Sequence, residues 1–214
     1  MNELDLLVYR LWEKLTRFNI TDDTRITKSL IRDWVISARS TALKEVYREH
    51  RVVPEAFYTL IRDMPLEKLR PDVTSTREFY VSLPVRLEAG IDHHNVAYFG
   101  PDDLMRNYNR LPLIAFKTVG ACRFTGKDPY YTVQEDRILI KNPADGLKRA
   151  TMLCVTERPV LINNAEVFPI PQSIQLKVEL LVFKDISVTF GVPIDILNDA
   201  AELQVGGGEG RRQE

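Results

Sequence analysis

Nine prolines at short intervals place the strongest limit on how this chain of 214 residues can fold. They stand at Pro54, Pro65, Pro71, Pro84, Pro101, Pro112, Pro129, Pro143 and Pro159. A proline inside a helix removes a backbone hydrogen bond and clashes with the preceding turn, so this spacing excludes long helices. The central part of the chain is therefore predicted to consist of short strands and turns.

Seven short stretches between these prolines have the length and the residue types of β-strands. They cover residues 56–62, 78–87, 95–99, 113–119, 130–134, 137–141 and 150–156. The two stretches that flank Glu135-Asp136 predict a β-hairpin with a two-residue loop. We therefore expect a small, mainly antiparallel β region over about residues 55–157, with a strand order that the sequence leaves open.

Both flanks of this region show helical periodicity instead. Apolar residues three or four positions apart predict one helix over about residues 4–18 and a second over about residues 28–48. The two stripes are Leu4, Leu7, Val8, Leu11, Trp12, Leu15 and Phe18, and Leu30, Ile31, Trp34, Val35, Ala38, Ala42 and Val46. Thr24 or Thr27 can cap the second helix. Adjacent amphipathic helices with a short connection are expected to pack as a hairpin.

A third helix is predicted after Pro169-Ile170-Pro171, because proline is favourable at the first helical position. Its apolar stripe is Ile174, Val178, Leu181, Val182 and Ile186. Gly191 is a typical residue just beyond a helix end, which places the helix over about residues 173–190.

Together these patterns predict a single α+β domain over residues 1–204. It has an N-terminal helical hairpin, a central mainly antiparallel β region and a long C-terminal helix that packs with the hairpin as one helical layer. Trp12 and Trp34 are expected to be largely buried within it. The glycine-rich residues 205–214 predict a tail that is flexible or ordered by a partner.

The charge balance gives no bulk attraction to nucleic acid or to anionic membranes, since 29 Lys and Arg residues face 30 Asp and Glu residues. Cys122 and Cys154 are too few for a disulfide framework and lack metal-ligand spacing, which indicates a reducing compartment. No apolar run approaches the ~18 residues of a membrane span. Acids follow Met1 where a signal peptide would carry Lys or Arg. We expect a soluble protein, made in the cytoplasm, with no membrane partner.

No pattern in the sequence predicts a catalytic residue, a cofactor site or a metal site. The sequence contains no glycine-rich phosphate loop, no nucleophile elbow and no His-Glu-x-x-His helix. Cys122 has no nearby base and is expected to be a buried apolar residue.

Three clusters come closest to a metal site, and each has a simpler interpretation. The neighbouring histidines of Asp92-His93-His94 would point to opposite faces of a strand, so this cluster is interpreted as a polar loop. Asp22-Asp23 and Asp102-Asp103 are interpreted as caps at helix starts, where carboxylates accept hydrogen bonds from free N–H groups.

Several segments follow one another in a characteristic order over nearly the whole chain. They are Thr21-Asp22-Asp23-Thr24-Arg25-Ile26-Thr27, Val53-Pro54-Glu55-Ala56-Phe57-Tyr58, Met64-Pro65-Leu66-Glu67-Lys68-Leu69, the hairpin at 131–143, the strand at 147–159, Phe168-Pro169-Ile170-Pro171 and Pro193-Ile194-Asp195-Ile196-Leu197-Asn198-Asp199-Ala200. In this order they resemble the small structural proteins from the neck and tail of crAss-like and related Bacteroidetes phages. Residues 88–109 depart from the pattern of that family, which leaves the β topology open.

The resemblance implies a virion structural protein without catalytic residues. Many copies would form an oligomeric ring in the neck or tail, as a head–tail connector or collar. The ring would contact the portal and neighbouring neck or tail proteins, and would enclose the genomic DNA without sequence-specific binding. The chain would be synthesised in the host cytoplasm. A ring of this kind is a head-to-tail interface that closes on itself.

Two alternatives stay open from the residues alone. One is a phage enzyme of nucleic-acid metabolism with an unrecognised site that uses Asp22 and Asp23. The other is a DNA-binding regulator that uses the second helix, where Arg32, Arg39 and Lys44 lie. Acidic residues are interspersed with these cations, which favours a solvated helix face with internal ion pairs.

The segment after the third helix is the candidate interface. Ordering it costs roughly 1–2 kcal/mol of backbone entropy per residue, and contacts with a partner are the expected compensation. We expect residues 193–214 to reach onto an adjacent subunit or another protein. Ile194, Ile196 and Leu197 would be the apolar anchors, and Arg211 and Arg212 would pair with acidic groups. The alternative is a local cap formed by residues 192–203, followed by a loose tail.

Overall fold

The computed structural model describes residues 3–17, 26–69, 77–119, 128–159 and 168–190. The chain divides into two compact units: a helical unit, Met1–Arg51 with Ala165–Glu214, and a β unit, Val52–Asn164. The α+β class predicted from the sequence is confirmed. Each unit is a group of residues with many contacts among themselves, which does not show whether the two units fold separately. The single domain over residues 1–204 therefore stays a prediction.

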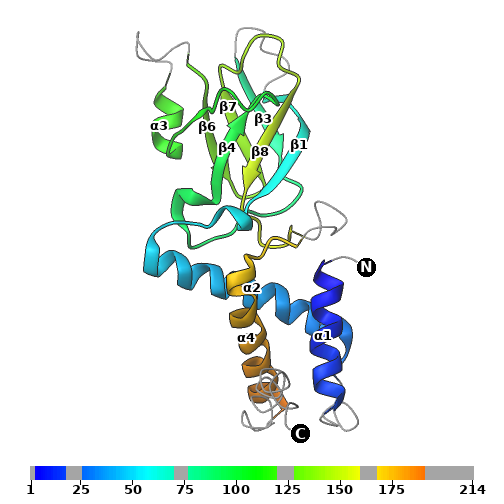
Figure 1. Ribbon diagram of the computed structural model, residues 1–214. Coiled ribbons are helices and arrows are strands. Elements are labelled where there is room, and N and C mark those ends of the chain that lie inside the picture. Colours follow the sequence, from blue (N-terminus) through cyan, green and yellow to red (C-terminus); the bar gives the residue numbers. More distant parts are fainter. Residues whose placement is uncertain (1–2, 18–25, 70–76, 120–127, 160–167, 191–214) are drawn as a thin grey trace, which may run out of the picture. The chain divides into compact units, whose positions relative to one another are not determined.

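Among its described residues the helical unit has three helices: α1 (Glu3–Arg17), α2 (Lys28–His50) and α4 (Gln172–Phe190). Helix α2 packs against both α1 and α4 (Figure 1). An ion pair of 2.9 Å between Lys14 Nζ and Glu179 Oε2 joins α1 to α4 directly. The helical layer and its three elements are therefore confirmed, with boundaries that differ from the predicted ones by no more than two residues.

The ends of α2 show why the helix has these limits. Thr27, one of the two predicted caps, accepts a hydrogen bond of 3.2 Å from the Leu30 N–H through its hydroxyl oxygen. At the other end Arg51 adopts a left-handed conformation with φ 55°, and its N–H donates to the Tyr47 carbonyl at 2.8 Å.

The two tryptophans lie at the margin of this layer and not in its centre. Trp12 and Trp34 are both half-buried. Trp34 meets the ring of Phe190 edge-on at 6.0 Å, and Lys28 Nζ lies 5.9 Å from the Trp12 ring. The centre of the layer is aliphatic instead, with Leu11 and Ile31 fully buried.

Arg39 departs most from its predicted environment. Sequence reasoning placed it on a solvated face of α2, but its exposed fraction is 0%. Its Nε donates to the Pro169 carbonyl at 2.9 Å, and the guanidinium lies 6.0 Å from the Phe168 ring. Arg39 therefore fixes the segment that leads into α4, and it does not form part of a DNA-reading surface.

The described part of the β unit contains eight strands in two sheets. The smaller sheet has the order β1-β8-β4, from Thr59–Pro65, Arg149–Cys154 and Val96–Gly100. The larger sheet has the order β2-β3-β7-β6-β5, from Glu67–Lys68, Glu78–Ser82, Arg137–Lys141, Tyr130–Gln134 and Asn109–Arg110. All pairs are antiparallel except β5 with β6. The predicted β6–β7 hairpin is confirmed to the residue.

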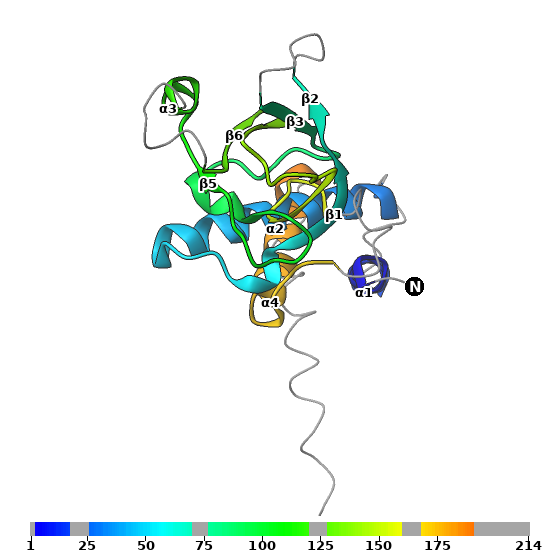
Figure 2. The same ribbon diagram turned by 90° about the horizontal axis from the view of Figure 1, so that it is seen from above.

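One apolar core is shared by the two sheets. Phe99 and Met152 contribute to it from the smaller sheet, and Tyr131 and Ile138 from the larger one. The chain passes from β1 to β2 across Leu66 alone and so changes sheet within one residue. Seen from above, the larger sheet follows a curve around this core, with α3 (Leu113–Thr118) outside it (Figure 2).

Two local predictions in the β unit are wrong. Residues 113–119 were predicted as a strand, but Leu113–Thr118 form α3. Asp102-Asp103 were interpreted as a helix cap, but no helix begins there in the described chain. The carboxylate of Asp102 accepts from Thr151 Oγ1 at 2.9 Å, and that of Asp103 accepts from the Met105 N–H at 2.9 Å, so both acids stabilise a turn.

Because two titratable side chains are buried in the β unit, we expect the chain to lose stability at alkaline pH. Burial raises the pKa of the Cys154 thiol to about 12 from its ordinary 9.0, and the pKa of Tyr131 to about 12 from 10.0. Both groups are neutral when protonated. Their contribution to the free energy of unfolding is therefore complete below about pH 9 and is lost as the pH rises toward 12. For the Cys154 thiol, the difference between its ordinary pKa and its pKa in the folded chain corresponds to about 4 kcal/mol of unfolding free energy. In urea unfolding at pH 8 and pH 11.5, Cys154→Ala should lose less stability than the unaltered chain; equal losses would contradict this.

Candidate assembly interface

A cleft opens at the edge of the larger sheet, where β5 separates from β6. The two residues of β5 pair with Tyr130 and Tyr131 of β6. The N–H of the next residue, Leu111, donates to the Tyr131 carbonyl at 2.8 Å. The chain next turns away into Pro112 and α3. A cavity of about 650 Å³ lies in the opening. Its walls are His93, Val96, Asn107, Tyr108, Asn109, Arg110, Leu111, Pro112, Leu113, Tyr131, Thr132 and Val133.

Beyond the two residues of β5, the outer edge of β6 has no pairing strand among the described residues. Backbone groups along a strand face its two neighbours alternately. Since the Tyr131 carbonyl faces β5, the Val133 peptide groups face the same side, two residues further on. No described strand lies beside Val133 on that side. Unpaired N–H and C=O groups at a strand edge are ready to pair with another chain.

Arg110 is a half-buried cation in the wall of the cleft. Its Nη1 donates to the His93 carbonyl at 2.9 Å and to Asn95 Oδ1 at 2.7 Å. Both acceptors are uncharged, and no carboxylate of the described residues pairs with this guanidinium. Burial lowers the pKa of Arg110 from its ordinary value, although arginine stays charged at neutral pH. No acceptor for the N–H groups on Nε and Nη2 lies among the described residues.

The wall opposite β6 is held in place by backbone bonds to β4. Asn107 accepts from the Phe99 N–H at 3.1 Å through Oδ1, and the Tyr108 N–H donates to the Phe99 carbonyl at 2.8 Å. Gly100 makes this approach possible, because a Cβ at this position would overlap the Arg106 carbonyl oxygen. The residues that lead into β5 are therefore fixed, and the cleft does not depend on a loose loop.

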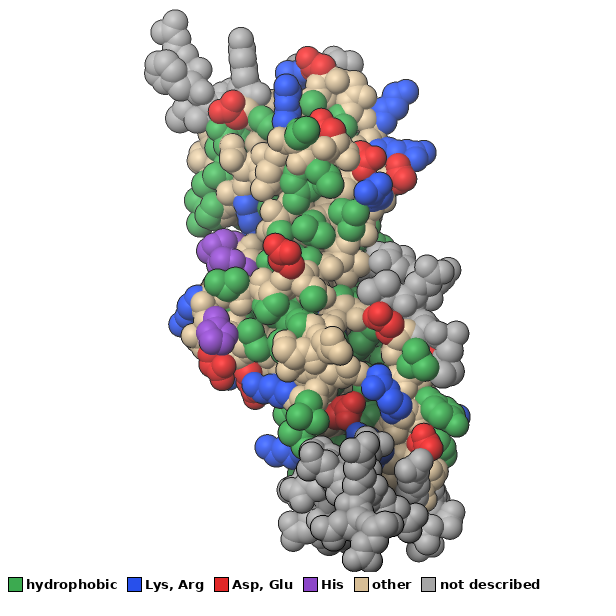
Figure 3. All heavy atoms as spheres, in the orientation of Figure 1, with side chains coloured by type: hydrophobic (Ala, Val, Ile, Leu, Met, Phe, Trp, Pro, Cys, Tyr) green, Lys and Arg blue, Asp and Glu red, His purple; other side chains and the backbone are tan. Residues whose placement is uncertain are grey.

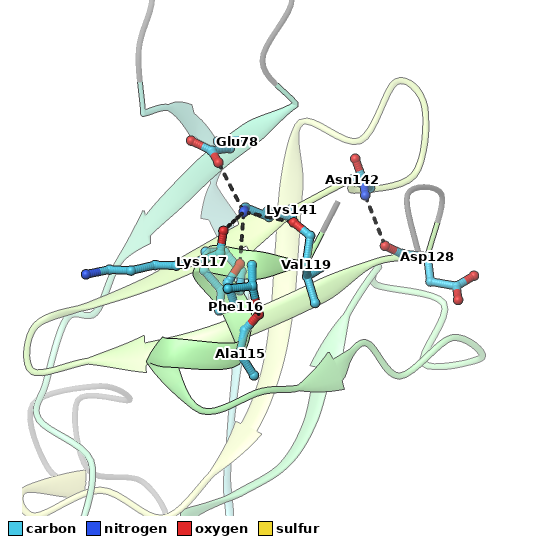
Figure 4. A network of polar contacts seen from close by, with 9 residues as sticks. Glu78, Ala115, Phe116, Lys117, Val119, Asp128, Lys141 and Asn142 are labelled. Carbon is cyan, nitrogen blue, oxygen red and sulfur yellow. Dashed lines mark hydrogen bonds and ion pairs between the residues drawn. The ribbon is translucent and has the colours of Figure 1, made fainter. Parts of the chain in front are cut away.

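Lys141, at the end of β7, fixes the C-terminal end of α3 beside the cleft (Figure 4). Its Nζ donates to the carbonyls of Phe116 at 2.9 Å and Val119 at 3.2 Å, and it lies 3.4 Å from Glu78 Oε1. An ammonium group suits the free carbonyls at a helix C-terminus. The next residue, Asn142, donates from Nδ2 to the Asp128 carbonyl at 3.3 Å.

Replacing Lys141 by methionine is expected to lower the free energy of unfolding by about 1–3 kcal/mol, because charged hydrogen bonds to half-buried carbonyls are lost. Lys117→Met is the matched control, since the Lys117 side chain is exposed on the same helix; we expect a change within about 0.5 kcal/mol. Urea unfolding of both variants provides the measurement. Equal effects would show that Lys141 does not hold α3.

His93 and His94 lie on the short helix η2 (Asp92–Asn95) and not on a strand. Their rings stack at 4.4 Å instead of pointing to opposite faces. Within the described ranges, no group of three or more His, Cys, Asp or Glu residues gathers in a metal-binding arrangement.

The predicted interface residues Ile194, Ile196, Leu197, Arg211 and Arg212 lie outside the described residues. The same holds for the acids of the alternative enzyme site, Asp22-Asp23, and for Cys122. Sequence reasoning did not single out Arg110 or Lys141. Nothing in their neighbours along the chain distinguishes them, because their surroundings come from other strands.

Helix α4 exposes a row of large apolar side chains. Leu176, Leu180 and Val188 are 61%, 45% and 77% exposed, and their spacing of four and eight residues places them along one side of the helix. Its opposite side, with Val178 and Val182, is buried. This exposed row is typical of a protein–protein contact.

The charges on the β unit are mixed. On the face in Figure 3, Lys and Arg side chains are interspersed with Asp and Glu. Several form pairs, such as Arg149 with Asp63 at 3.1 Å and Arg77 with Asp145. A reader of DNA sequence normally presents a continuous basic face. The mixed charges therefore do not favour sequence-specific DNA binding by this face.

An exposed apolar row on α4 and a strand edge with no described neighbour are features typical of proteins that associate with other protein chains. None of the helices in the described part of the chain is long and apolar enough to cross a membrane. The family described as phage tail ring protein 2 matches residues 6–204, which is nearly the whole chain. The chain belongs to this family of crAss-like phage tail ring proteins. A comparison with the curated proteins finds no match.

Proposed function

We propose that the chain is a non-enzymatic structural subunit of the virion that forms an oligomeric ring in the neck or tail. The observation that carries this proposal is the family match over residues 6–204. The apolar row on α4 and the open edge of β6 support it, because a ring subunit needs two different surfaces for its two neighbours.

In this ring, each copy contacts further copies, and the ring contacts the portal or adjacent neck and tail proteins, as a head–tail connector or collar. It encloses the genomic DNA without reading its sequence, in keeping with the mixed charges of the β unit. Residues 1–204 act as one domain, and residues 205–214 form a tail ordered by a partner. The chain is made in the host cytoplasm and ends in the particle.

The segment 193–214 is proposed as an assembly arm. Ile194, Ile196 and Leu197 anchor it on a neighbouring subunit or protein, and Arg211 and Arg212 pair with acidic groups there. The arm directly follows the exposed row of α4, so both features would extend one contact surface.

Native mass spectrometry and negative-stain microscopy of the purified chain, together with antibody labelling of virions, test the proposal. We expect closed rings and labelling at the neck or tail. Nuclease, nucleotidyltransferase and ATPase assays with Mg²⁺ or Mn²⁺ should show no turnover. A turnover that Asp22→Ala or Asp23→Ala abolishes would contradict a purely structural role.

A further inference from the structure

We propose that the cleft beside β6 binds the segment Ile194-Asp195-Ile196 of a second copy of this chain, which adds a short strand to the β6 edge and places its Asp195 carboxylate on Arg110. The inference rests on the proposed function, because it assigns an acceptor site to the assembly arm of a ring subunit.

The backbone of β6 supplies the first part of the site. The outward-facing peptide groups at Val133 have no described strand beside them, and β5 leaves the sheet just before this point. An extended segment placed there continues the line of β5 and forms main-chain hydrogen bonds. Such bonds bind an extended chain without selecting its sequence, so selection must come from the side chains of the cleft.

Arg110 supplies the charge selection. Its guanidinium is half-buried, and both of its acceptors among the described residues, the His93 carbonyl and Asn95 Oδ1, are uncharged. A carboxylate that reaches the free N–H groups on Nε and Nη2 would form a charge-assisted pair away from bulk water. The site therefore favours an acidic segment over a neutral or basic one.

The other walls of the cleft select apolar neighbours for this carboxylate. Val96 is buried, and Leu111, Leu113 and Val133 are half-buried around the opening. Side chains alternate between the two faces of a strand, so a segment with the order apolar–acidic–apolar presents its acid on one face and its two apolar side chains on the other. Arg110 pairs with Tyr131 and so lies on the same face of the sheet as Val133, while Leu111 lies on the other face. The acid of such a segment therefore meets Arg110, and its two apolar side chains meet the Leu111 side of the cleft.

The C-terminal segment of the chain has this order and this charge. Ile194-Asp195-Ile196 is apolar–acidic–apolar. Residues 191–214 contain five acids and two arginines, which gives a net charge of −3 from the side chains. Asp195 is five residues beyond Phe190, the last residue of α4, and five residues span at most about 17 Å. The contact therefore places the β6 edge of one copy near the end of α4 of the next, which is a head-to-tail arrangement.

Charge exchange between the two positions tests the pairing. We expect Arg110→Glu and Asp195→Arg each to reduce ring formation at least tenfold in native mass spectrometry, as expected for the loss of one partner of a buried charge pair. The double variant should restore it. Arg106→Glu, which changes an exposed arginine four residues from Arg110, is the matched control and should form rings normally. Because Arg110→Glu also removes bonds to η2, Asp195→Arg gives an independent result in a chain whose β unit is unaltered.

Co-expression of the two single variants identifies the second copy as the donor. The unaltered Asp195 of the Arg110→Glu chain then meets the unaltered Arg110 of the Asp195→Arg chain. At the next contact the two substituted positions meet with opposite charges, so alternating copies of the two variants form rings.

Rescue in the double variant, with no mixed oligomer of any size in the co-expressed sample, would mean that the arm binds its own chain, which overturns the proposal. Normal rings from both single variants would also overturn it while leaving the ring function intact. If the unaltered chain forms no ring, the proposed function itself fails.

Discussion

Deletion of residues 193–214 is expected to leave a folded chain that no longer enters particles. The described helices and strands of both units lie before this segment in the chain, so the variant retains all of them. The proposed contacts of Ile194, Ile196 and Leu197 with a neighbour would be lost together. Complementation of a phage that lacks the gene measures the effect as the yield of infectious virions, which should fall to background.

A shorter deletion separates the anchors from the tail. Removal of residues 205–214 alone retains the three apolar anchors and should reduce particle yield much less than the full deletion. Circular dichroism and urea unfolding of both truncated chains confirm that they are folded. Intact necks and infectious particles from the chain without residues 193–214 would show that this segment is not an assembly arm.

Replacing Arg39 by alanine is expected to cost about 3–5 kcal/mol of unfolding free energy. The variant leaves the Pro169 carbonyl without its donor and opens a cavity between α2 and the segment at Phe168. This loss is a large part of the stability of an ordinary domain, about 5–15 kcal/mol. Urea unfolding at neutral pH measures it.

Two further variants separate the causes of this loss. Arg39→Met restores most of the volume without the hydrogen bond, so it should be intermediate in stability. Arg32→Ala removes a more exposed arginine of the same helix, whose distance to Asp5 is 3.8 Å, and should change stability by about 0.5 kcal/mol or less. If Arg39→Ala and Arg32→Ala were equally stable, burial of Arg39 would have no energetic role.

The parts of the fold that follow from local patterns were predictable. The apolar stripes of α1, α2 and α4 repeat over four or more turns, and the β6–β7 hairpin has a short loop between two alternating stretches. Leu113–Thr118 were assigned to a strand because a short apolar run fits either element. Contacts with the rest of the β unit stabilise the helix instead, because Lys141 binds the carbonyls at the C-terminal end of α3.

The candidate interface was predictable only in part. The apolar and acidic residues of the C-terminal segment are visible in the sequence, but the acceptor proposed for it is a cleft lined by residues from η2, β4, β5 and β6. Arg39 shows the same difficulty, because the sequence of a helix with several arginines does not show which of them is buried. Its environment arises from the segment at Phe168, 129 positions further along the chain.

The pair Lys141 and Asn142 also makes the β unit a practical host for inserted sequences. These neighbouring residues bind the carbonyls of Val119 and Asp128, so both boundaries of the segment 120–127 are fixed from one strand end. Doubling the length of a connection between fixed ends costs only about 0.6 kcal/mol. An epitope or a fluorescent label placed between residues 119 and 128 is therefore expected to leave the sheet pairing intact.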